Sequence, residues 1–174
     1  MAAVDAGVLF RALEKKKKDR FAQACRDFWV AMLKDPNRRI IIPAPAFAEY
    51  LRGGASALPS TAQVYVVPFD ARCAEIMAES LPQHILSVQI AAFKAQYGKD
   101  REGNEAPGSF IKYDAMIAVC AKRWGADRLV SIDTDLKKLA AKLPLDCQTP
   151  DYFYGDQVHI DVAKLRAVGS SEEK

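Results

Sequence analysis

One stretch, residues 111–136, constrains the fold of this chain more than any other. Its apolar pattern predicts a helix at 114–124, and Gly125 then supplies a common helix stop. A short buried strand is predicted at 129–132, and Asp133 follows directly after it. A helix that leads into a buried strand is the repeating unit of an α/β fold, so this stretch predicts that fold class.

The rest of the chain continues the alternation of strands and helices. The isoleucine run at 40–42 is typical of a strand that is buried on both faces. Further strands are predicted at 2–4, 64–67 and 145–148, and further helices at 8–18, 21–34, 46–51, 71–80, 83–97 and 134–142. This order predicts an α/β sandwich with a mainly parallel sheet. We expect one domain at 1–150 and a C-terminal extension at 151–174 with a disordered end.

Composition narrows the possible classes of function. The 25 Lys and Arg barely exceed the 22 Asp and Glu, so the chain as a whole is not strongly basic. The local cluster of lysines at 15–18 is interpreted as a solvated helix face. Four widely spaced cysteines and two histidines form no zinc pattern and suit a reducing compartment. The sequence has no signal-peptide pattern and no membrane-span pattern, and we therefore expect a cytoplasmic protein.

Four carboxylates are expected to meet at one edge of the sheet. Asp5 and Asp133 each follow a predicted strand, and ligands bind beyond the carboxyl ends of parallel strands. Glu49 follows the strand at 40–42 after a short connection. Asp114 is predicted in the first turn of its helix, where the helix dipole favours a negative charge. The four side chains can therefore converge on one rim.

Such a cluster of acids requires a compensating charge. Two like charges about 4 Å apart repel by about 4 kcal/mol at an effective dielectric constant of about 20. A hard divalent cation with oxygen ligands, Mg²⁺ or Mn²⁺, is the natural partner. One or two such ions can activate a water molecule for attack on phosphorus. The cluster thus indicates phosphodiester hydrolysis.

Each acid also has a simpler explanation when it is considered alone. Asp114 could be an ordinary first-turn charge, and Asp133 could cap the helix that follows it. Asp135 could serve as a cap or a solvated charge. Glu49 is harder to explain in this way, because it lies in an apolar segment where a charge needs a partner. The joint occurrence of the acids favours the metal site.

The segments around these acids resemble the four acidic motifs of PIN-domain nucleases, in the same order. The matching segments are residues 4–9, 42–49, 112–118 and 130–136, and the resemblance extends over roughly residues 2–148. It implies a PIN-like α/β/α sandwich with the activity of a Mg²⁺- or Mn²⁺-dependent endoribonuclease, the fold of VapC-type toxins in bacterial toxin–antitoxin pairs. The metal ligands that it implies are Asp5, Glu49, Asp114 and Asp133.

The resemblance also implies supporting residues and partners. The Ser131 hydroxyl would orient a carboxylate or the attacking water, and Asp135 would support the site from behind the ligands. The expected substrate is RNA, with an antitoxin protein as partner if the chain is a toxin and no association with a membrane. A housekeeping nuclease, one or two metal ions and a homodimer all remain open.

Two other functions compete with the nuclease. A non-catalytic PIN-like module that binds RNA or protein is the main alternative, but such a module would be free to lose the four acids. A phosphotransfer domain is disfavoured, because a phosphatase of the haloacid-dehalogenase type requires Asp-x-Asp or Asp-x-Thr after its first strand, and this chain has Asp5-Ala6-Gly7.

Overall fold

The computed structural model describes residues 1–14, 21–55, 58–98 and 108–151. Its centre is a five-stranded sheet in the order β3-β2-β1-β4-β5, in which every neighbouring pair is parallel. The strands are β1 (Ala2–Val4), β2 (Ile40–Pro43), β3 (Val64–Val67), β4 (Arg128–Val130) and β5 (Asp146–Gln148). The prediction of an α/β sandwich with a mainly parallel sheet is confirmed.

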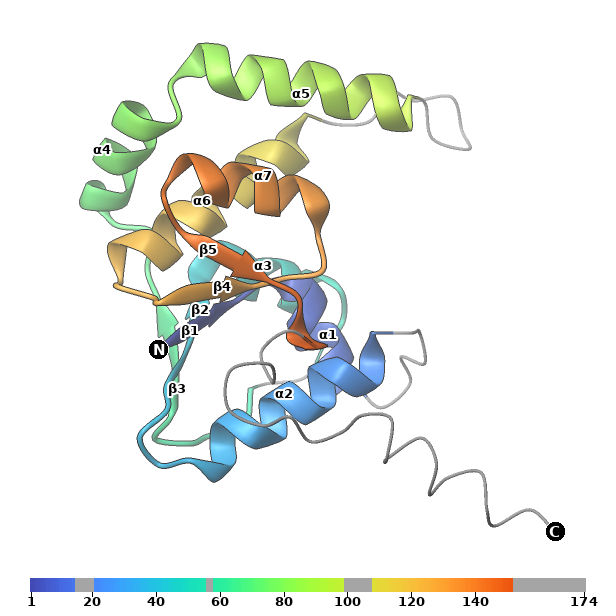
Figure 1. The fold of residues 1–174 in the computed structure, drawn as a ribbon, viewed down its shortest axis with the longest axis vertical. Helices are drawn as coiled ribbons and strands as arrows, with labels where there is room; N and C mark the ends of the chain where they lie inside the picture. The colour runs from blue at the N-terminus through green and yellow to red at the C-terminus, as the bar shows by residue number, and fades with distance from the viewer. Residues whose placement is uncertain (15–20, 56–57, 99–107, 152–174) are drawn as a thin grey trace, which may run out of the picture.

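Helices cover both faces of the sheet. Within the described residues they are α1 (Ala6–Leu13), α2 (Ala22–Lys34), α3 (Ala44–Arg52), α4 (Ala71–Ser80), α5 (Gln83–Tyr97), α6 (Ser109–Arg123) and α7 (Thr134–Lys142). Figure 1 shows α6 and α7 together on one side of the sheet and α1 and α2 together on the other, with α5 lying across α6 and α7 at one end. None of the described helices is both long and apolar enough to cross a membrane.

The apolar runs in the sequence explain the layered core. All residues of β1 and β2 are buried, as the isoleucine run predicts for strands with helices on both faces. Burying each large apolar side chain contributes about 1.5–3 kcal/mol relative to leaving it exposed. The strand β3 lies at one edge of the sheet, where Tyr65 and Val66 are exposed.

Several predicted element boundaries differ from the structure. The helix α1 begins at Ala6, because Asp5 caps it, and α3 begins at Ala44, because a proline is tolerated in a first helical turn. The helix α6 begins at Ser109, so Asp114 is in the second turn. The predicted first-turn position of Asp114 is therefore wrong, and the dipole argument does not apply to it.

Some predictions fall on parts of the chain that the structure does not describe. The lysine cluster at 15–18, most of the predicted loop at 98–109 and nearly all of the extension at 151–174 lie outside the described residues. The domain boundary at residue 150 also stays a prediction. Within the described part, β5 pairs with β4 and so belongs to the same sheet as the other strands.

A close contact between α1 and α3 sets the spacing of the segments that carry Asp5 and Glu49. The rings of Phe10 and Tyr50 lie 5.1 Å apart, and the buried Tyr50 donates a hydrogen bond of 3.2 Å to Glu14 Oε1. Gly53, at the end of α3, lies directly against the Phe10 ring, so a Cβ atom at this position would overlap that ring. The contact therefore depends on the absence of a side chain at residue 53.

Replacing Gly53 with alanine is expected to lower the free energy of unfolding by about 1–3 kcal/mol, because the added methyl overpacks the α1–α3 contact. The backbone at Gly53 has a φ of −73°, which alanine adopts freely, so the effect would be steric. Urea unfolding measures it. Gly53→Ala should cost less stability in a Phe10→Leu background than in the parent chain, because the shorter side chain leaves room for the methyl group. A Gly53→Ala variant that is more stable than the parent would disprove the close contact.

Candidate active site

Asp5 connects the end of β1 to the start of α1. The Val8 backbone N–H donates to Asp5 Oδ1 at 2.8 Å, and the Ser131 hydroxyl donates to Asp5 Oδ2. The residue is only 5 % exposed. Burial raises the pKa of Asp5 to about 6, against the opposing effect of these two hydrogen bonds, and the charges of Asp133 and Glu49 add to the rise. The buried carboxyl group of Asp5 therefore interacts electrostatically with two other acids, Asp133 and Glu49.

Ser131 joins the ends of two neighbouring strands. It follows β4 directly, is buried, and donates to the carboxylate of Asp5, which follows β1. Its Oγ atom also accepts a hydrogen bond of 2.9 Å from the Asp133 backbone N–H. One hydroxyl thus holds both the side chain of Asp5 and the backbone of Asp133.

Asp133 has a structural role in addition to its position beside the other acids. Its Oδ1 atom accepts hydrogen bonds from the backbone N–H groups of Asp135 at 2.7 Å and Leu136 at 3.2 Å, and so caps α7. The capping explanation of Asp133 is therefore correct. It does not exclude a place in the site, because the charge of Asp133 also raises the pKa of Asp5, Glu49 and Asp114.

Asp114 is the carboxyl group most strongly affected by its neighbours. It lies half-buried in α6, and its pKa rises to about 8. Desolvation by burial is the largest cause, followed in order by the charges of Asp133, Glu49, Asp5 and Asp135. These four acids come from three segments of the chain, the end of β1, α3 and the start of α7, so the fold gathers them around Asp114.

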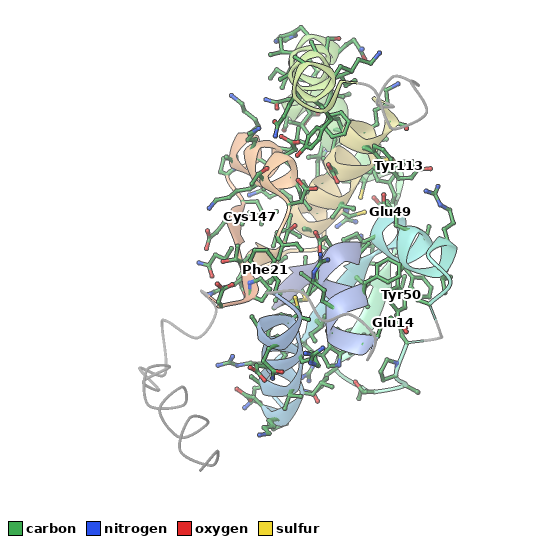
Figure 2. The ribbon with its side chains drawn as sticks, turned by 90° about the vertical axis from the view of Figure 1, so that its right-hand side faces the viewer. Glu14, Phe21, Glu49, Tyr50, Tyr113 and Cys147 are labelled. Carbon is green, nitrogen blue, oxygen red and sulfur yellow. The ribbon has the colours of Figure 1, made fainter. Side chains whose placement is uncertain are left out.

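Glu49 completes the group of four from α3. Burial raises its pKa, the charge of Arg52 one turn later lowers it, and Asp133 raises it again. The guanidinium of Arg52 also lies 5.9 Å from the ring centroid of Tyr113, the residue before Asp114. Figure 2 shows Glu49 and Tyr113 on the same flank of the molecule. The α3 and α6 sides of the site therefore meet here.

The donor set fits a hard divalent cation by its chemistry. All four candidate ligands are carboxylates, which suit Mg²⁺ and Mn²⁺, and burial together with mutual repulsion raises the pKa of three of them. A bound cation would stabilise their ionised forms. Among the described residues, no three acidic, histidine or cysteine side chains stand at the spacing of a ready-made metal-binding set. Binding would therefore require these side chains to adjust.

Comparison with known families identifies the fold. The family model of the PIN domain matches residues 2–142. The chain belongs to the PIN-domain family. PIN domains are generally metal-dependent nucleases that act on RNA or other nucleic acid, usually with a divalent metal such as Mg²⁺. A search of curated proteins found no match to this chain.

The sequence only partly indicated the role of a fifth acid in this PIN domain. Asp135 is 6 % exposed, so its interpretation as a solvated charge is wrong. Its Oδ1 atom lies 2.6 Å from Lys138 Nζ, and its charge contributes to the raised pKa of Asp114. The spacing of three residues between Asp135 and Lys138 on a helix was a detectable signal for this ion pair. Only the fold brings the pair to the border of the site.

Proposed function

We propose that this PIN domain is a Mg²⁺- or Mn²⁺-dependent endoribonuclease whose metal ligands are Asp5, Glu49, Asp114 and Asp133. The observation that carries the proposal is the environment of Asp114. Burial and the charges of four nearby acids raise the pKa of this carboxyl group to about 8. A divalent cation is the partner that would keep these acids ionised together at neutral pH.

The chain's own residues have distinct tasks in this proposal. The Ser131 hydroxyl holds Asp5 in one orientation, and the cap that Asp133 forms on α7 limits the movement of its carboxylate. Glu49 and Asp114 approach from α3 and α6. When bound, the metal would polarise a phosphate oxygen and lower the pKa of a water molecule that attacks phosphorus. The half-buried position of Asp114 would limit the access of bulk water to that charge.

The proposed nuclease has two candidate biological roles: a toxin with an antitoxin partner, or a housekeeping nuclease. A small protein encoded beside this gene should bind the purified chain and inhibit its cleavage of RNA if the chain is a toxin. Co-expression followed by co-purification distinguishes the two roles. A neighbouring product that neither binds nor inhibits the chain would favour the housekeeping nuclease.

The activity itself is tested by incubating the purified chain with a labelled RNA that has both single-stranded and hairpin regions. We expect internal cuts with Mg²⁺ or Mn²⁺ and none with EDTA, because the four acids supply no nucleophile without a metal-bound water. A DNA of the same sequence shows whether the sugar matters. RNA that is bound but stays intact with either metal would favour a non-catalytic module, and cleavage in EDTA would rule out the metal mechanism.

A further inference from the structure

Three aromatic rings gather where the end of α5 meets the start of α6. The ring centroids of Phe93 and Tyr97 lie 4.7 Å apart, and those of Phe93 and Phe110 lie 6.1 Å apart in an edge-on arrangement. Phe93 is half-buried and packs against the core, whereas Tyr97 is 51 % exposed and Phe110 is 45 % exposed. The aromatic cluster, Phe93, Tyr97 and Phe110, therefore offers two ring surfaces to solvent on a fixed base.

The aromatic cluster lies close to the candidate active site along α6. Phe110 precedes Asp114 by four residues, and side chains at this spacing occupy the same side of a helix, one turn of about 5.4 Å apart. The Phe110 ring is thus displaced from Asp114 mainly along the helix axis. Figure 1 shows α5, which carries the other two rings, lying above α6 and α7.

Lys138 of α7 connects the aromatic cluster to the acids. Its ammonium pairs with Asp135, and the pair raises the pKa of Lys138, with smaller contributions from Tyr97 and Asp133. The side chain of Lys138 is 51 % exposed. The ion pair with Asp135 therefore holds this positive charge in the first turns of α7, and its charge also interacts weakly with Tyr97 of the aromatic cluster. A positive charge beside exposed rings suits a phosphate next to a stacked base.

We propose that the aromatic cluster is a stacking platform for unpaired RNA bases next to the cleavage site, with Lys138 contacting the phosphate between them. This proposal rests on the nuclease function proposed above and specifies its substrate as a single-stranded segment. Phe110 and Tyr97 present ring faces or edges to a base, and Phe93 supports both rings from the core. The bound RNA would then run from the carboxylates over the start of α6 toward α5.

The charge and position of the surface favour RNA over a protein partner. A purely apolar docking surface would gain nothing from the ammonium of Lys138, whereas a nucleic acid presents both a π-face and a phosphate at this scale. Phe110 of the aromatic cluster lies one helical turn from Asp114 on α6, so a bound RNA strand could occupy the cluster and the carboxylate site together. Stacking requires an unpaired base, so a duplex should benefit much less.

The test uses Tyr97→Ala and Phe110→Ala, singly and together, in a chain that also carries Asp114→Asn so that the RNA stays intact. Fluorescence anisotropy measures the binding of a mixed-sequence 5′-fluorescein RNA, single-stranded or annealed to its complement, in Mg²⁺. We expect the double variant to bind the single strand about tenfold or more weakly, since a base–aromatic stack contributes about 1–3 kcal/mol and 1.4 kcal/mol is a factor of ten. Duplex binding should change by less than about threefold.

A matched control is available on the sheet edge. Tyr65 is 46 % exposed on β3, and Tyr65→Ala should leave the binding of both RNA forms unchanged. Tyr97→Phe should bind like the parent, because it keeps the ring. Single-strand binding that is unaffected in the double variant would overturn the platform, and so would an equal loss for single strand and duplex. A change in oligomeric state at unchanged RNA affinity would instead identify the rings as a protein interface.

The cleavage activity of the chain without Asp114→Asn separates this proposal from the nuclease proposal. If that chain cuts RNA and the ring variants keep the parental KM, the platform is wrong and the nuclease stands. If it binds RNA in a ring-dependent way without cutting it, the platform stands and the nuclease is wrong. If both are correct, the ring variants should raise KM for the single strand by a larger factor than they lower kcat, because the rings act on binding and the carboxylates act on the chemistry.

Discussion

Replacing Asp114 with asparagine is expected to abolish RNA cleavage and, in the absence of metal, to stabilise the fold. The substitution removes a metal ligand, which should lower kcat/KM by about a hundredfold or more, since a bound metal supplies several kcal/mol of transition-state stabilisation. It also replaces an acid whose charged form is disfavoured by burial and by the neighbouring acids. Asparagine has nearly the same shape and carries no charge.

Two measurements on the same preparation check this prediction. Cleavage assays in Mg²⁺ report activity, and thermal unfolding in EDTA at pH 8 reports stability. Asp27→Asn is the matched control, because Asp27 is an exposed helical aspartate on α2 that accepts a hydrogen bond from Gln23. It should leave both quantities nearly unchanged. Asp114→Asn protein that cuts RNA normally would refute the metal assignment, and a large loss of stability would mean that Asp114 is mainly structural.

The stability of the metal-free chain is expected to fall as the pH rises from about 4 to about 8. The folded-state pKa values of Asp5, about 6, and Asp114, about 8, both lie above the ordinary value of 3.8. Between these values the folded chain holds protons that the unfolded chain releases. For each such proton, the free energy of unfolding falls by about 1.4 kcal/mol for every unit by which the pH rises. This contribution is therefore complete below pH 4 and is lost as the pH passes through 6 and 8.

Mg²⁺ should reverse this trend at the alkaline end. The metal binds the ionised carboxylates, so it stabilises the fold strongly at pH 8, whereas at pH 5 it must first displace protons. Urea unfolding across this pH range, in EDTA and in Mg²⁺, measures both effects. In EDTA, Asp114→Asn should flatten the decline between pH 6 and pH 8. A Mg²⁺ effect of equal size at pH 5 and pH 8 would contradict the proposed ligands.

The sequence predicted the elements of the fold well wherever local chemistry defines them. The isoleucine run at 40–42 predicted β2, and the predicted helix at 71–80 is α4, which begins after a capping residue, Asp70, whose Oδ1 atom accepts a hydrogen bond from the Cys73 N–H at 2.9 Å. The start of α6 was missed because it carries no such signal. Its N-cap is Gly108, which makes no side-chain hydrogen bond, so the local sequence carries no side-chain capping signal for the first turn of α6.

The sequence was enough to select the acids of the candidate site, but it did not predict how their side chains interact. Asp5, Glu49, Asp114 and Asp133 could be selected because each follows a strand or lies on a neighbouring helix near one sheet edge. The burial of Asp135 and the contact between the Phe93 and Phe110 rings depend on how α5 and α7 pack around α6. Such packing combines residues that are far apart in the chain, and no local pattern encodes it.

The Ser131 bridge restricts where this chain can change in length. Parallel pairing sets Val4 opposite Val130, so the next residues, Asp5 and Ser131, leave the sheet side by side. Inserting or deleting one residue in β1 or β4 would shift one partner by about 3.3 Å and turn its side chain to the opposite face. A change in length outside these two strands and their two following residues would leave this pairing intact. The region that would bind RNA must keep its spacing.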